Sequence, residues 1–311
     1  MSNYPVVTWI TDGTTASDYR PAIAADGKTI VFERSGQKEG TVLYRLVIGS
    51  GDPPHRFLPT LNAGQTRPDW CWANGRIAFN VAADGSNSVS LVDSDGNHVS
   101  PVKNTGGFVY PQWDAAGKRL VVMNQSASAS PKPCSSVIDT GGGMVHPNVN
   151  GKDAAGTPMY GGMPAVSPKD ADLIAFAGQP DSPEWGSSGY QQSLNYIFVN
   201  QAGSSGYSSN PLEPLAPTGK FTPSFQGRAP AWSPDGRYIV FESDRSGGYA
   251  LFLFDRKNSN KAPIQLTDPN QNPAQHAKFY PNGTQLIFCA NPSPQAKNFG
   301  IASIDISKYV G

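Results

Sequence analysis

The sequence predicts an all-β protein, a six-bladed β-propeller made of four-stranded antiparallel blades. A strand-turn-strand pattern recurs six times along the 311 residues, and further β-rich segments follow most of the copies. Gly and Pro contribute 33 and 28 residues, which is typical of short strands separated by tight turns. We therefore expect residues 1–311 to form a single propeller domain.

The repeated unit is clearest in Pro230-Ala-Trp-Ser-Pro-Asp-Gly-Arg-Tyr-Ile-Val-Phe241. The six copies begin at Pro21, Pro68, Pro111, Pro164, Pro230 and Ala277. The third residue of each copy is large and apolar: Ile23, Trp70, Trp113, Val166, Trp232 and Phe279. The twelfth is Phe32, Phe79, Val122, Phe241 or Phe288, and Phe176 comes one residue late in the fourth copy. Dipeptides such as Asp26-Gly27 separate the two anchors and favour a turn with positive φ, so each copy is predicted as a β-hairpin.

The remaining strands of each blade are expected downstream of the hairpins. Third strands are predicted at 42–48, 88–93, 196–199, 250–254 and 301–306, another strand around 135–139, and a fourth strand at 263–267. The last copy ends after its third strand, while residues 5–11 form an unattached β-rich segment. Trp9-Ile-Thr-Asp-Gly13 matches Gln265-Leu-Thr-Asp268, which favours an N-terminal strand that completes the last blade over one that merely caps an edge.

Composition excludes several classes of protein. With 24 basic and 24 acidic residues the net charge is zero, which argues against a nucleic-acid binder. No apolar run approaches the ~18 residues of a membrane span, and the N-terminus has no signal-peptide pattern. At face value this predicts a cytoplasmic protein, although the composition also fits a periplasmic or secreted protein in its mature form. The scattered Cys71, Cys134 and Cys289 predict buried free thiols.

The fifth copy, continued through Ser243-Asp-Arg-Ser-Gly247, resembles the repeat P-x-W-S-P-D-G-x-x-I-x-F-x-S-x-R-x-G of the TolB-like six-bladed β-propeller family. The resemblance extends over the whole chain in six copies and implies the fold, whereas a propeller scaffold serves many activities. No α/β domain precedes the first copy and no G-x-S-x-G nucleophile elbow is present. We therefore expect a stand-alone propeller without the TolB N-terminal domain or a peptidase domain, so a role in cell-envelope transport is not implied.

The residue before each copy is expected to face the channel mouth. These residues are Arg20, Arg67, Tyr110, Met163, Ala229 and His276, with Arg228 one position further out. Basic groups gathered in a narrow opening favour an anion, and guanidinium groups suit carboxylate or phosphate. Arg20, Arg67, Tyr110, Arg228 and His276 are therefore ligand-binding candidates. Alternatively, Asp18 and Asp69 neutralise the ring and leave a structural network.

Two long intervals, 124–163 and 178–227, interrupt the repeat. The second carries Trp185, Tyr190, Tyr207 and Phe225, whose aromatic faces would suit a sugar or a peptide. Trp185 and Tyr190 are the ligand-binding candidates of this group. The alternative is that these aromatic residues pin a long loop to the propeller wall.

Signals for catalysis are sparse. His55, His98, His146 and His276 show no metal-ligand spacing, so no metal or other cofactor is expected. The TolB-like family includes oligogalacturonate lyases, in which histidines hold manganese and basic channel residues bind uronate. The present chain matches only the basic part of that pattern. His276 and Tyr110 are the catalytic candidates for a metal-free lyase that removes an α-proton.

These observations predict a monomeric, non-catalytic binding propeller. Its expected ligand is acidic, either a uronate-containing carbohydrate or a carboxylate-bearing peptide or protein partner. A polysaccharide lyase acting on acidic sugars is the alternative, and a scaffold for protein assembly is a third possibility. Neither nucleic acid nor membrane insertion is expected.

Overall fold

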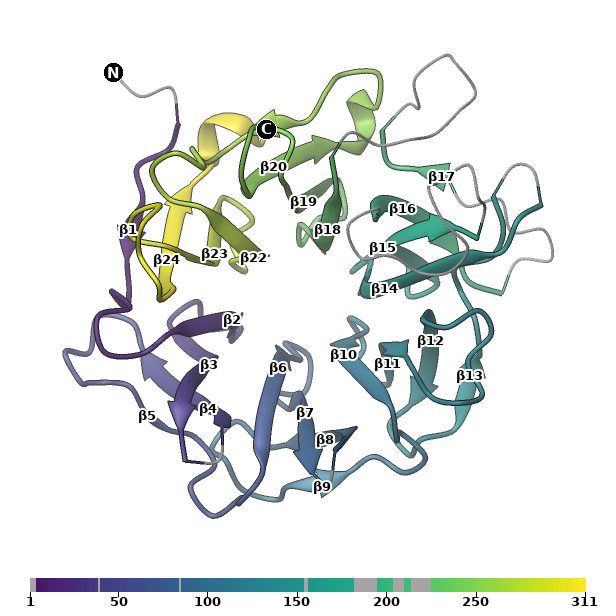
Figure 1. Cartoon of the computed structure of the whole chain (residues 1–311), viewed down its shortest axis with the longest axis horizontal. Helices are drawn as coiled ribbons and strands as arrows, with labels where there is room; N and C mark the ends of the chain where they lie inside the picture. Colours follow the sequence, from purple (N-terminus) through teal and green to yellow (C-terminus); the bar gives the residue numbers. More distant parts are fainter. Residues whose placement is uncertain are drawn as a thin grey trace.

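The computed structural model describes residues 4–38, 40–83, 85–153, 156–181, 195–203, 210–213 and 225–311. Six four-stranded antiparallel sheets surround a central channel, with the first strand of each hairpin innermost (Figure 1). Within these ranges, none of the helices has the length and apolar character needed to span a membrane. The predicted fold class is confirmed.

Each of the first five blades uses four strands in chain order, from the channel outward. Blade 1 contains β2 (Asp18–Ile23), β3 (Thr29–Gln37), β4 (Gly40–Val47) and β5 (His55–Arg56). Blade 2 contains β6 (Gly64–Trp70), β7 (Ile77–Ala83), β8 (Ser86–Val92) and β9 (Ser100–Pro101). Blade 3 contains β10 (Phe108–Trp113), β11 (Arg119–Asn124), β12 (Cys134–Asp139) and β13 (Met144–His146).

Blades 4 and 5 repeat this order. Blade 4 contains β14 (Met159–Val166), β15 (Leu173–Pro180), β16 (Tyr196–Gln201) and β17 (Asn210–Pro211). Blade 5 contains β18 (Gly227–Trp232), β19 (Tyr238–Ser243), β20 (Ala250–Asp255) and β21 (Ile264–Gln265). Two short 3-10 helices, η3 (Arg256–Asn258) and η4 (Ser307–Tyr309), follow third strands.

Blade 6 joins the two ends of the chain, as predicted. Its first three strands are β22 (Ala274–Phe279), β23 (Gln285–Ala290) and β24 (Gly300–Asp305), and its fourth is β1 (Thr8–Trp9). In the antiparallel β1–β24 pair, Thr8 lies opposite Ser303. The backbone N–H groups of Ile10 and Thr11 also donate to the carbonyl of Ile301, at 2.8 and 3.0 Å. The strand that closes the ring is therefore short, and further backbone hydrogen bonds beyond its end strengthen the contact between the two ends of the chain.

The hydrophobic core is divided into layers between neighbouring blades. One layer packs Val31 and Leu43 of blade 1 on Ile77 and Phe79 of blade 2, and similar clusters join the other adjacent pairs. The predicted twelfth-residue anchors are fully buried, which is the expected effect of removing large apolar side chains from water. Among the third-residue anchors, Val166 is only half-buried and borders the channel.

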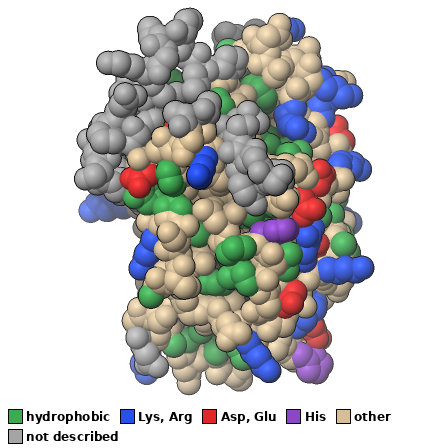
Figure 2. All heavy atoms as spheres, turned by 90° about the vertical axis from the view of Figure 1, so that its right-hand side faces the viewer, with side chains coloured by type: hydrophobic (Ala, Val, Ile, Leu, Met, Phe, Trp, Pro, Cys, Tyr) green, Lys and Arg blue, Asp and Glu red, His purple; other side chains and the backbone are tan. Residues whose placement is uncertain are grey.

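The outer wall is polar and mixed in charge. On the side shown in Figure 2, basic and acidic side chains occur together without one sign dominating the view. This agrees with the zero net charge of the chain. Several charged side chains of the channel are largely buried, and burial strengthens their interactions.

Candidate functional site

Each innermost strand contains one β-bulge just before its copy of the repeat. The strand register shifts at this point in all six blades. The bulged residue has a positive φ in every case: Arg20 (45°), Arg67 (54°), Tyr110 (55°), Met163 (48°), Ala229 (48°) and His276 (52°). Positive φ is uncommon for residues other than Gly, and bulges turn side chains away from the regular alternation. We call these six residues the channel ring.

Side chains of the preceding blade hold several of the bulges in place. The backbone N–H of Arg67 donates to Oε1 of Glu33 at 2.6 Å, and that of His276 donates to Oε2 of Glu242 at 2.7 Å. The N–H of Tyr110 donates to Oδ1 of Asn80 at 3.0 Å. Bonds to charged acceptors are stronger than neutral ones, so these contacts offset part of the backbone strain.

The channel ring lines a small cavity of ≈ 50 Å³. The structure thus brings together four of the predicted residues: Arg20, Arg67, Tyr110 and His276. Their polar side chains come from blades 6, 1, 2 and 3, while Met163 and Ala229 make the opposite side apolar. Arg228 does not line the cavity.

Most of the basic groups around the ring are paired with carboxylates. Nη1 of Arg20 lies 2.9 Å from Oε2 of Glu33. Arg228 forms an ion pair with the buried Glu242 and also lies over the ring of Tyr249. Burial raises the pKa of Glu242, and the guanidinium of Arg228 opposes that shift. Arg20 and Arg228 are therefore largely committed to structural ion pairs.

Arg67 differs from the other two arginines. No ion pair involves its guanidinium within the described ranges of the chain; Nη1 donates to Oγ1 of Thr66 at 3.2 Å. Its guanidinium carbon lies 4.5 Å from the centroid of the Tyr110 ring, a cation–π contact that fixes its position. Its buried Nε–H has no acceptor in the described structure, and the same is true of Nε of Arg20. Nε of Arg45, away from the ring, is in the same situation, so it is the missing ion pair that sets Arg67 apart.

His276 is neutral in this setting. Burial lowers its pKa well below the ordinary value, and the nearby cations Arg20 and Arg228 lower it further. Its ring makes an edge contact with Tyr19 at 4.9 Å between centroids. A neutral imidazole can accept or donate a hydrogen bond, so His276 does not add to the positive charge of the ring.

The carboxylates suggested by the sequence are engaged elsewhere. Asp18 forms a two-bond pair with Arg34 at 2.7 and 2.8 Å, and Asp69 accepts from Nζ of Lys278 at 3.0 Å. The ring is neutralised instead by Glu33 and Glu242, which follow the twelfth-residue anchors of their copies. A charged residue directly after a buried Phe was the available signal, and the sequence analysis missed it.

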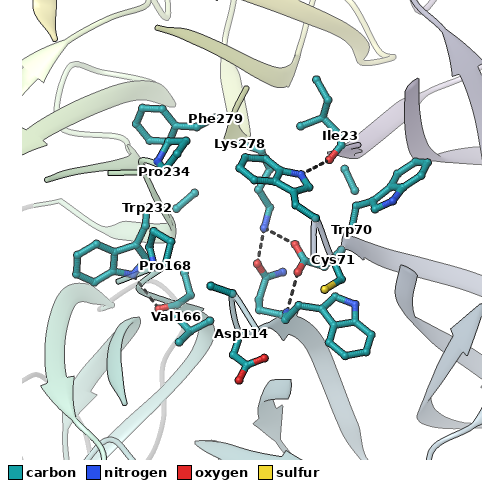
Figure 3. Close-up of a pocket in the computed structure, with 18 residues that line it drawn as sticks. Ile23, Trp70, Cys71, Asp114, Val166, Pro168, Trp232, Pro234, Lys278 and Phe279 are labelled. Carbon is teal, nitrogen blue, oxygen red and sulfur yellow. Dashed lines mark hydrogen bonds and ion pairs between the residues drawn. The ribbon is translucent and has the colours of Figure 1, made fainter. Parts of the chain in front are cut away.

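A second, wider pocket opens where the innermost strands lead into their hairpin turns (Figure 3). This hairpin-side pocket measures ≈ 190 Å³. The second residues of all six copies line it: Ala22, Asp69, Gln112, Ala165, Ala231 and Lys278. Gln112 and Lys278 border both cavities. Lys278 reaches from blade 6 across to Asp69 and Gln112 in blades 2 and 3, so this contact separates the ring from the pocket.

No model of a protein family matches the sequence, and no curated protein matches it. Among solved structures, TolB from Acinetobacter baumannii has a TM-score of 0.57 at 16% identity, over 81% of this chain and 55% of that protein. The chain therefore spans little more than half of that protein. A structure assigned to TolB from Agrobacterium tumefaciens has a TM-score of 0.63 at 15% identity, over 94% of this chain and 91% of the other.

The chain has the TolB-like six-bladed propeller fold. The fold is shared with other proteins as well. An oligogalacturonate lyase in complex with manganese gives a TM-score of 0.54 at 13% identity, over 97% of this chain and 96% of that one. At such identities the likeness concerns architecture, so the function of this propeller has to be argued from its own residues.

Only one of the four aromatic long-loop candidates, Phe225, lies within the described residues. Trp185, Tyr190 and Tyr207 lie outside the described residues. Phe225 packs against Arg245, whose guanidinium carbon is 4.1 Å from the ring centroid, and Arg245 forms an ion pair with Glu213. Phe225 thus anchors the segment that leads into blade 5, as the structural alternative predicted for this residue.

The described part of the TolB-like propeller contains no group of three or more His, Cys, Asp or Glu residues arranged to hold a metal ion. Cys71, Cys134 and Cys289 are buried free thiols. Burial raises the pKa of Cys71 and Cys134, which makes their thiolates unfavourable. These thiols are therefore poor nucleophiles and belong to the core.

Proposed function

We propose that this propeller is a binding module that accepts the carboxylate of a peptide or protein partner at the channel ring. The observation that carries the proposal is the guanidinium of Arg67, which forms no ion pair with a described residue and which Tyr110 holds beside the ring cavity. A carboxylate there would provide the counter-charge that Arg20 and Arg228 already have in Glu33 and Glu242. It would also provide acceptors for the unpartnered Nε–H groups.

The size of the cavity favours a carboxylate on a flexible stem. The ring cavity, at ≈ 50 Å³, is narrow beside the second pocket of ≈ 190 Å³. A carboxylate on a slender stem would enter it more easily than a whole pyranose ring. An acidic side chain or a C-terminus extends from its backbone and would reach the ring more easily than a carboxylate fixed to a sugar. Met163 and Ala229 would contact the apolar part of the stem.

A thermal-shift titration tests the proposal. The probes are the peptide Gly-Gly-Glu, its uncharged analogue Gly-Gly-Gln-amide, galacturonate and galactose. Binding to the native state stabilises it by mass action, so we expect the acidic peptide to raise Tm by about 5 °C at about 100 times its Kd. The uncharged peptide should have no effect. Arg67→Ala should weaken binding of the acidic peptide at least about tenfold, because a charge-assisted contact is lost.

The choice of variant matters for this test. Removing Arg20 or Arg228 would leave Glu33 or Glu242 buried without its ion-pair partner, which typically costs about 3–5 kcal/mol and would obscure an effect on binding. Arg67→Ala breaks no ion pair between described residues, and Arg56→Ala on the outer strand β5 serves as the control for loss of positive charge. Equal binding of the acidic peptide by both variants and the unaltered protein would exclude the ring as its site.

The lyase alternative rests on one observation. His276 is neutral and could act as a base, and it lies beside arginines that could neutralise a uronate. An oligogalacturonate lyase also shares the fold. A lyase releases an unsaturated uronide that absorbs in the near ultraviolet. Because the ring cavity is narrow, we expect no such absorbance when the protein is incubated with oligogalacturonate. A steady rise that is lost in His276→Gln would favour the lyase instead.

A further inference from the structure

The hairpin-side pocket differs in chemistry from the channel ring. At ≈ 190 Å³ it is roomier than the ring cavity of ≈ 50 Å³, and none of the bulged residues lines it. Asp69, Gln112 and Lys278 form its polar floor and Asp114 is a buried carboxylate at its edge, while its other walls are mainly apolar or aromatic. It is thus a separate candidate site at the other end of the channel.

One wall of the pocket is an exposed tryptophan. Trp72 follows β6 and keeps 40% of its surface accessible, although large apolar side chains are mostly buried in this protein. Its Nε1–H donates to the carbonyl of Ile23 in blade 1 at 2.8 Å, which fixes the indole across two blades (Figure 3). An aromatic face that is held in place before binding loses little conformational entropy when a ligand covers it.

The opposite wall consists of aliphatic groups. Val166 and Pro168 of blade 4 and Pro234 of blade 5 lie across the pocket from Ile23, Trp70 and Cys71 (Figure 3). Pyrrolidine rings and a valine side chain offer no hydrogen-bonding groups. A flat ligand that lies between this wall and Trp72 would find no hydrogen-bond partner on either of its faces. Both faces of such a ligand must therefore be apolar.

The floor supplies one polar contact. Nζ of Lys278 donates to Oδ1 of Asp69 at 3.0 Å and to Oε1 of Gln112. An ammonium group has three N–H donors, and these two contacts use two of them among the described residues. The remaining donor can serve a neutral acceptor, while the charge of the lysine is already balanced by Asp69.

We propose that the hairpin-side pocket binds a single aromatic ring that carries a neutral hydrogen-bond acceptor, such as an amide carbonyl. The ring lies between Trp72 and the wall of Pro168 and Pro234, and the acceptor receives a hydrogen bond from Lys278. A pyranose would press its hydroxyl groups against the proline wall, where they lack partners. A carboxylate would compete with Asp69 for Lys278.

Ligand-observed NMR titrations test this inference with three small probes: benzamide, cyclohexanecarboxamide and methyl glucoside. For a probe of this size we expect a Kd of about 1 mM for benzamide. The aliphatic amide, which has the same acceptor without the aromatic ring, should bind at least about fivefold more weakly. Methyl glucoside should bind more weakly still.

Variants of Trp72 locate the site. Trp72→Ala should weaken benzamide binding about tenfold, whereas Trp72→Phe should retain most of it because a ring remains. Ile264→Ala, which removes another exposed apolar side chain on β21, is the control, and Tm measurements check that each variant is folded. Arg67→Ala should leave benzamide binding unchanged, so this result is independent of the function proposed for the ring.

A further probe separates two sources of the aromatic ring. Tighter binding of Gly-Phe-Gly-amide than of benzamide would assign the ring to a peptide, and weaker binding would assign it to a free small molecule. Both results support the site when they are lost in Trp72→Ala. Unchanged binding in that variant, a preference for methyl glucoside, or no binding of any aromatic probe would overturn the inference.

Discussion

At the scale of single residues, the protonation of His276 depends on its neighbours more than on its own chemistry. Burial and then the cations Arg20, Arg228, Arg67 and Lys278 lower its pKa well below the ordinary value of 6.5. In the unfolded chain the imidazole would have a pKa of about 6.5. Below that pH the unfolded state therefore binds a proton that the native state does not accept, and native stability falls as the pH decreases.

His276→Gln is expected to remove this part of the pH dependence. Over the window from pH 6.5 down to the lowered native pKa, His276 costs the native state up to about 1.4 kcal/mol per pH unit. Urea unfolding at pH 7.5 and 5.5 should show a smaller loss of unfolding free energy in the variant than in the unaltered protein. His55→Gln changes an exposed histidine and should leave the loss as it was. Equal losses in all three proteins would show that the pKa of His276 does not differ between the native and unfolded states.

At the scale of secondary structure elements, the bulge is the feature that shapes the site. It recurs in all six innermost strands, including those that carry Met163 and Ala229, so it belongs to the architecture of the blade. Its effect is that the bulged residue and the second residue of each copy both border the channel. The bulge thus determines which side chains reach the ring and which reach the hairpin-side pocket.

The strain of the bulge can be measured where the side chain is smallest. Ala229 has a φ of +48°, a region that Gly adopts without steric cost. Ala229→Gly would relieve this strain in the native state, but Gly also makes the unfolded chain more flexible. The net effect is expected to raise the free energy of unfolding by up to about 1 kcal/mol. The buried Ala231 is the control, since Ala231→Gly should lower it by about 1 kcal/mol. Denaturant melts that show a loss for both variants would contradict the strain argument.

At the scale of the whole molecule, closure of the ring depends on a short strand. β1 contributes only Thr8 and Trp9 to blade 6, supported by the hydrogen bonds of Ile10 and Thr11. Trp9 packs at the edge of the core layer between blades 5 and 6. A covalent link at this point would hold the two ends of the chain together in the unfolded state as well, and so reduce its entropy.

Thr8→Cys combined with Ser303→Cys places the two thiols on residues that face each other across the strand pair. The oxidised variant is expected to be more stable than its reduced form by about 2–4 kcal/mol, because the disulfide closes a very long loop. The three native thiols are buried, which limits exchange with them. Thermal melts with and without reductant make the comparison. Equal melting temperatures would show that unfolding does not require the ring to open at β1.

Much of the fold was predictable from local patterns. The spacing of the third and twelfth residues predicted six hairpins, and the similarity around Trp9 predicted closure by the N-terminal strand; both are confirmed. These features repeat in sequence and depend on nearest neighbours, which is why a single chain reveals them. The bulge was not predicted, since its residues are Arg, Tyr, Met, Ala and His rather than Gly.

The candidate site was predictable only in part. The repeat placed Arg20, Arg67, Tyr110 and His276 in equivalent positions, and the structure brings them to one cavity. The same reasoning overlooked Lys278 in the second position of its copy, where Asp69 and Gln112 are also polar. A set of polar residues in a position that is Ala in the other copies was the signal for the second pocket.

The sequence by itself determined the blades, their number and their closure, because hairpins and apolar anchors are encoded within each copy. Only the tertiary structure decided which basic groups are free. Arg20 and Arg228 pair within their own hairpins, 13 and 14 residues away, whereas Lys278 meets Asp69, 209 residues away, only because the closed ring brings the two blades together. Among the described residues Arg67 lies near no carboxylate that pairs with it, and this depends on distance in space rather than in sequence, as Coulomb energies do.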